Sequence, residues 1–171
     1  MEQPSPPSPP PPRYSSRAFP PYRFAPGKSP HPRRDPKGHT YGQPEVPPPR
    51  FPPERWKENH EYLHGIDLYN HAYWWECHEC LEGLWHLTGH TGREALFLQG
   101  VIQVAAANLQ RFLEHPDGAR RLAVEAIEKL VRVEAKEFMG LKLGPFIRQV
   151  NDYHLDEDRD QPPQITLEPW P

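Results

Sequence analysis

The residues of this sequence best suited to chemistry are one histidine and two carboxylates within residues 74–85. His78 and Glu82 lie four positions apart, and Glu79 follows the histidine directly. On a helix, side chains four positions apart are neighbours, so His78 and Glu82 would lie side by side. A histidine beside a carboxylate can exchange protons with a substrate, and the two together can ligate a metal ion. We therefore take this pair as the centre of a candidate site.

The helix face that would carry this pair is otherwise apolar and rich in tryptophan. Its members, taken at about 100° per residue, are His71, Trp74, Trp75, His78, Leu81, Glu82 and Trp85. Because an apolar face packs against a core, the spacing predicts that the His–Glu pair is buried or half-buried. A buried polar group without a partner costs about 1–3 kcal/mol, so the pair should have further partners.

Glutamines on the following helical segment are the expected partners. Gln99 and Gln103 align on one stripe of a segment that is otherwise apolar nearly all round, as in a central helix. Gly100 and the alanines at 105–107 would let a neighbouring helix approach closely. We expect one polar site with Trp75 and Trp85 as its walls, and its polar members are His78, Glu79, Glu82, Gln99 and Gln103.

Three interpretations of this site are open. The leading one is the binding of a small polar ligand or a protein partner, whose identity the sequence does not give. The second is a metal-assisted or acid–base hydrolase that uses His78 with Glu79 or Glu82. The third is a purely structural polar cluster that fixes the register of the helices.

A divalent metal ion is the cofactor that the second interpretation would require. His78 and Glu82 would ligate it, and Glu79 makes the run H-E-x-x-E, similar to the zinc-protease pattern H-E-x-x-H with its last histidine replaced. A catalytic zinc needs three protein ligands, so a third would have to come from elsewhere. His71, His31, His39 or another acidic residue are the candidates.

Hydrophobic periodicity predicts an all-α bundle of about five helices within residues 51–155. We expect helices from Pro53 to Asn70, from Asn70 as a cap to Leu87, and from Arg93 to Leu113. A fourth would run from Pro116 to Glu137 and end at Gly140, and a short fifth would open at Gly144-Pro145. No strand pattern is visible. Residues 156–171 form an acidic tail that we expect to fray.

The N-terminal third differs sharply from the helical part in composition. Nineteen of the 25 prolines lie in residues 1–53, and residues 1–50 carry a charge of +5 against −8 for the remainder. Residues 1–18 are expected to be a disordered proline-rich leader. The basic segment 19–50 interleaves aromatics and histidines with proline, and we expect it to dock on the helical domain, with an exposed linker or a partner-binding peptide as alternatives.

Composition also argues against several classes of protein. There is no signal-peptide pattern and no apolar run of the roughly 18–20 residues that a membrane helix needs, so we expect a soluble, cytoplasmic protein. Cys77 and Cys80 lack the second pair of a zinc ribbon and are interpreted as core-filling thiols. No recognition helix accompanies Arg33 and Arg34, so nucleic acid is not an expected partner. The oligomeric state is left open.

Two motifs resemble those of the bacterial and archaeal family called domain of unknown function 309. The run W-W-E-C-H-E-C-L-E-G-L-W at residues 74–85 and the run F-L-Q-G-V-I-Q-V-A-A-A at 97–107 fit the family patterns E-x-H-E-x-L-E-x-x-W and L-Q-G-x-I-Q. The resemblance covers about residues 56–152, implies a small helical bundle and brings no established activity. It adds Glu76 to the candidate ligand-binding residues. The basic proline-rich segment lies outside it.

Overall fold

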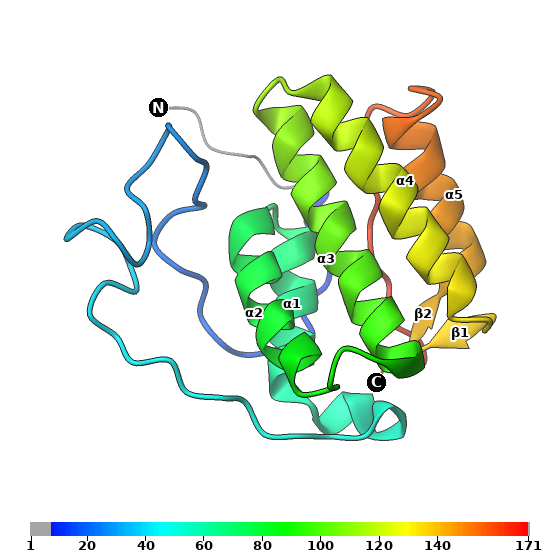
Figure 1. Cartoon of the computed structure of the whole chain (residues 1–171), viewed down its shortest axis with the longest axis horizontal. Coiled ribbons are helices and arrows are strands. Elements are labelled where there is room, and N and C mark those ends of the chain that lie inside the picture. Colours follow the sequence, from blue (N-terminus) through cyan, green and yellow to red (C-terminus); the bar gives the residue numbers. More distant parts are fainter. Residues whose placement is uncertain (1–7, 171) are drawn as a thin grey trace.

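Five α-helices and one short 3-10 helix form a single bundle in the computed structural model, which describes residues 8–170 (Figure 1). The 3-10 helix is η1 (Pro53–Glu58), and the α-helices are α1 (His60–Asn70), α2 (Trp74–His86), α3 (Gly92–Phe112), α4 (Pro116–Arg132) and α5 (Leu143–His154). Helix α3 is central, because it packs against both α2 and α4, while α1 packs on α2 and α5 on α4. The predicted all-α class is confirmed, as is the extended segment before it.

The first predicted helix is divided in two. Asn59 separates η1 from α1, and its side-chain oxygen accepts a hydrogen bond from the backbone N–H of Tyr62 at 3.1 Å, which caps α1. Asn70 was expected to cap the next helix, but it is the last residue of α1, and α2 begins at Trp74 after a turn. Ala72 occupies the left-handed region in that turn, with φ of 64°.

The predicted end of the fourth helix is wrong, because α4 stops at Arg132 and a β-hairpin follows. Strands β1 (Glu137–Phe138) and β2 (Leu141–Lys142) pair in antiparallel register. Their two-residue turn, Met139-Gly140, has positive φ at both positions, the geometry that closes tight hairpins. Trp56 packs on Gly140 so closely that a Cβ there would lie 2.6 Å from its ring, which excludes a larger residue.

The C-terminal segment is not frayed, contrary to expectation. It returns along the bundle from the end of α5 to the hairpin (Figure 1), and Ile165 and Leu167 are each only 1% exposed. Asn70 holds it by two hydrogen bonds, donating to the Ile165 carbonyl at 2.7 Å and accepting from the Ile165 N–H at 2.9 Å. The tail adds the aliphatic side chains of Ile165 and Leu167 to the core, and the main-chain groups of Ile165 are hydrogen-bonded. Both kinds of contact hold the tail on the bundle.

The N-terminal arm, defined here as residues 8–52, has no regular helix or strand and runs beside α1 and α2 (Figure 1). Tyr14, Phe24 and Ala25 of the arm are buried. The predicted leader of residues 1–18 is therefore partly wrong: residues 1–7 lie outside the described part of the chain, but Tyr14 is buried and its hydroxyl accepts a hydrogen bond from the Leu167 N–H at 2.9 Å. None of the described helices is long and apolar enough to cross a membrane.

Candidate functional site

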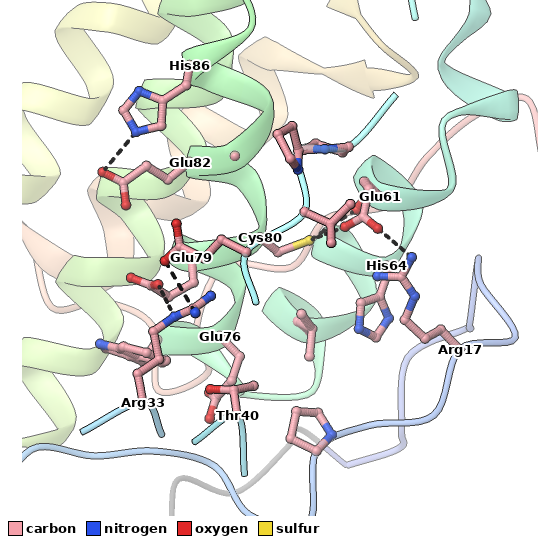
Figure 2. Close-up of a pocket in the computed structure, with 18 of the residues that line it drawn as sticks. Arg17, Arg33, Thr40, Glu61, His64, Glu76, Glu79, Cys80, Glu82 and His86 are labelled. Atoms are coloured by element: carbon pink, nitrogen blue, oxygen red, sulfur yellow. Dashed lines mark hydrogen bonds and ion pairs between the residues drawn. The ribbon is translucent and has the colours of Figure 1, made fainter. Parts of the chain in front are cut away.

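A cleft of about 830 Å³ lies between the N-terminal arm and the outer faces of α1 and α2 (Figure 2). Helix α1 contributes Glu61, His64 and Leu68 to its wall. Helix α2 contributes Trp75, Glu76, Glu79, Cys80, Glu82, Gly83 and His86, and the arm contributes Arg17, Pro20, Arg33, His39, Thr40 and the segment 44–48. The cleft therefore exists only because the arm crosses the bundle.

Glu76 is a buried carboxylate on the wall of this cleft. Its side chain is 5% exposed, and its Oε1 accepts hydrogen bonds from the Phe24 N–H at 2.8 Å and lies 3.1 Å from Nε2 of His39. Its other oxygen, Oε2, is buried and has no hydrogen-bond partner among the described residues. Carboxylate oxygens are strong acceptors, so this atom is an unused acceptor beside a cleft.

His64 gives the same wall a second buried polar atom without a partner. Its Nδ1 has no hydrogen-bond partner within residues 8–170. Burial, reinforced by the positive charge of Arg17, lowers the pKa of His64 to about 4, although Glu61 and Asp67 act in the opposite direction. The imidazole is therefore neutral at physiological pH and offers one donor and one acceptor.

Ion pairs between the arm and the helices form the sides of the cleft (Figure 2). Arg17 contacts Glu61 at 2.5 Å, and Arg33 lies between Glu45, at 3.2 Å, and Glu79, at 3.7 Å. Burial opposes the ionisation of Glu61, but the hydrogen bond from Arg17 keeps its pKa below the usual value. These pairs attach the basic arm to acidic side chains on both helices.

His78, Glu79 and Glu82 converge, but they are half-buried. Nδ1 of His78 lies 3.5 Å from Glu79, Nε2 lies 3.5 Å from Glu82, and the three side chains are 34%, 32% and 38% exposed. One ligand atom from each falls within 4.8 Å of the others, which is compatible with a shared metal ion. The spacing predicted that His78 and Glu82 are neighbours, and they are. It predicted that the pair is buried or half-buried, and the pair is half-buried.

The predicted glutamine network does not form. Gln103 donates to Glu125 on α4 at 2.9 Å, so it faces the opposite neighbour of α3. Helix α2 meets the bundle through Trp74, Cys77, Leu81 and Leu84, which turns His78 and Glu82 away from α3. Trp75 does line the cleft, where Phe24 and His31 of the arm pack on it. Trp85 instead stacks on His90, with 3.9 Å between ring centroids.

Part of the helical bundle is similar to a known protein family. Residues 62–122 match the family model described as Domain of unknown function (DUF309). The match supports the resemblance stated from the two motifs, over a shorter range than the motifs suggested. The DUF309 segment, residues 62–122, contains His64, Glu76 and the His78–Glu82 cluster, whereas the whole arm lies outside it. A comparison with curated proteins gives no significant match.

The sequence pointed to a docked arm and named His39 as a possible metal ligand, but it did not predict which arm residues line the site. His39, Arg33 and Arg17 complete the cleft, and His64, which is only 6% exposed, was not among the predicted site residues. The available signal was charge, since the arm is basic and the remainder acidic. Charge indicates that the two parts attract each other, but it does not say which carboxylate pairs with which arm residue.

Proposed function

We propose that the cleft binds a small polar ligand that carries a cationic group. The observation that supports this most strongly is that two residues lining the cleft, Glu76 on α2 and His64 on α1, each have a buried polar atom, Oε2 and Nδ1, without a partner within the described residues. Each such atom costs about 1–3 kcal/mol when left unpaired. A ligand that donates to Glu76 and bonds to His64 removes both costs.

The charge of the cleft favours a cation over an anion. Five glutamates line it (Glu45, Glu61, Glu76, Glu79 and Glu82), against the two arginines Arg17 and Arg33. Arg33 is shared between two of these carboxylates, so the acidic side chains outnumber the arginines that could neutralise them. An alkyl guanidinium or amine supplies several donors and a compensating charge, and its alkyl part can contact Trp75 and Leu68.

Replacing Glu76 with glutamine is expected to weaken the binding of such a probe at least about 10-fold. Glutamine keeps an oxygen for Phe24 and His39 but replaces the free acceptor with an N–H₂ donor. The measurement is an NMR titration of the full chain with n-butylguanidinium, followed at the Trp75 indole and Thr40 amide signals. Glu128→Gln, on the exposed side of α4, is the matched control and should bind like wild type. Equal affinity for the Glu76 variant and wild type would contradict the proposal.

A metal-assisted or acid–base hydrolase remains the second candidate function. It is supported by the convergence of His78, Glu79 and Glu82 at the edge of the cleft. A mixed imidazole and carboxylate set suits zinc, iron or manganese, and a bound metal would supply an activated water. A carboxylate that is not on the metal would then accept the proton from that water.

Metal analysis of chain purified without an affinity tag tests this second candidate. The expected result is about one zinc, iron or manganese ion per chain. That metal should be lost in His78→Ala and kept in His60→Ala, whose histidine is exposed at the start of α1. Metal content that is negligible in wild type, or unchanged in His78→Ala, would remove this candidate.

A further inference from the structure

The face of α1 and α2 that holds the arm has the chemistry of a peptide receptor. Asp67 on α1 is fully buried, and all the side-chain hydrogen bonds that the described residues give it come from the arm: Arg13 Nε at 3.0 Å, the Tyr14 N–H at 2.8 Å and the Ser15 N–H at 2.8 Å. Two of these donors are consecutive backbone amides. Asp67 therefore recognises an extended main chain together with one arginine.

Glu76 on α2 is a second buried carboxylate that binds the arm, at Phe24, ten residues after Tyr14. Its Oε1 accepts the backbone N–H of Phe24 and lies against Nε2 of His39, so both of its partners are again in the arm. Buried carboxylates are costly without partners, and here the bundle itself provides no side-chain partner for either one within the described residues. The two acidic positions act as fixed anchor points for one extended segment.

Aromatic contacts fill the space between the two anchors. Phe19 packs on His71 and Tyr73, with ring centroids 4.8 and 4.9 Å away. The Tyr73 hydroxyl donates to the Pro20 carbonyl at 3.2 Å, and Arg23 donates to the His71 carbonyl at 2.8 Å. A proline-rich extended segment loses little entropy on binding to such a surface, which is why proline-rich ligands suit aromatic grooves.

The helical face that binds the arm and the arm itself belong to different parts of the chain. Asp67, His71, Tyr73 and Glu76 all lie inside the DUF309 segment, and the arm lies outside it. We infer that the α1–α2 face is a peptide-recognition groove for extended basic segments with spaced aromatics and prolines. In this protein its own arm occupies the groove, and a partner protein's segment of the same chemistry displaces it. The inference does not depend on the ligand of the cleft.

A labelled peptide of residues 12–26 of the arm, P-R-Y-S-S-R-A-F-P-P-Y-R-F-A-P, is the probe that tests this inference. In the wild-type chain the attached arm competes at an effective concentration of roughly millimolar, so the peptide binds weakly. In the full chain with Arg13→Ala and Phe19→Ala the attached arm is weakened, and we expect the peptide to bind at least about 10-fold more tightly. Adding Asp67→Asn to that variant should reduce binding again by at least about 10-fold, while adding Glu128→Gln should not.

Hydrogen exchange on the wild-type chain keeps the test informative if a variant folds poorly. The amides of Tyr14, Ser15 and Phe24 donate to Asp67 and Glu76, so they should exchange slowly, and excess peptide should accelerate their exchange by displacing the arm. A peptide with the same residues in scrambled order should leave it unchanged. If the native peptide neither binds the weakened-arm variant saturably nor accelerates exchange in wild type, the inference is wrong.

Discussion

Replacing Asn70 with alanine is expected to lower the free energy of unfolding by about 3 kcal/mol and to release the C-terminal segment. The Asn70 side chain is buried and bonds both the N–H and the carbonyl of Ile165. Alanine leaves both of these main-chain groups unpaired in the core, and it also leaves a cavity. Ile165 then loses the side-chain contact that fixes its main chain.

Denaturant unfolding measures this loss, and limited proteolysis after residue 155 detects the released segment. Asn151→Ala is the matched control, because Asn151 also donates from its side chain, to Asp156 at 2.6 Å, but at an exposed site. That control should change the stability by less than about 1 kcal/mol. An Asn70 variant that is as stable as the control, with an uncut tail, would show that the tail does not depend on this amide.

Acidification from pH 7 to pH 5 is expected to destabilise the protein by about 3–4 kcal/mol through two buried histidines. Burial, aided by the charge of Arg111, lowers the pKa of His154 to about 4, and burial with the charge of Arg17 does the same for His64. The unfolded chain takes up protons near the ordinary histidine pKa of about 6.5, but the native state does not. Stability is therefore complete above about pH 6.5 and is lost as the pH falls toward 4.

The surroundings of His154 explain why it resists protonation. Its Nε2 bonds to the side-chain oxygen Oδ1 of Asn108 at 2.8 Å, and Nδ2 of Asn108 in turn donates to the Tyr69 hydroxyl at 3.3 Å. Nδ1 is buried and has no partner within the described residues, so a proton there would be an unpaired buried charge.

Unfolding curves recorded across this pH range test the assignment. The double variant His64→Gln/His154→Gln should lose most of the change in stability between pH 7 and pH 5, because glutamine does not titrate. His60→Gln, at an exposed position, should keep the wild-type profile. A double variant whose stability still falls like that of wild type would place the titrating groups elsewhere.

Local periodicity was enough to predict the helices but not the ends that depend on distant contacts. The apolar repeats of α3 and α4 lie within one helix each, so their starts were predicted within one residue. The hairpin at Met139-Gly140 depends on Trp56, more than eighty residues earlier, and the tail depends on Asn70. Pairings of this kind leave no periodic signal in the sequence.

The candidate site was predicted in part, for a related reason. The adjacency of His78, Glu79 and Glu82 follows from helix geometry alone, and the structure contains it. Their orientation was misjudged because the arm buries a second side of α2, so that Glu76 is enclosed while His78 stays half-exposed. An extended arm has no periodicity of its own, and part of its attachment comes from backbone amides, those of Tyr14, Ser15 and Phe24, which every sequence possesses.

A crystal of the full chain soaked with n-butylguanidinium would show whether the cleft binds a cation. We expect the probe in the cleft, with a guanidinium nitrogen within hydrogen-bond distance of Glu76 Oε2 and the alkyl chain against Trp75. The same soak of Glu76→Gln crystals should leave the cleft without the probe. A wild-type cleft without the probe, in which protein groups or ordered water satisfied both Glu76 Oε2 and His64 Nδ1, would show that the cleft is not a cation site.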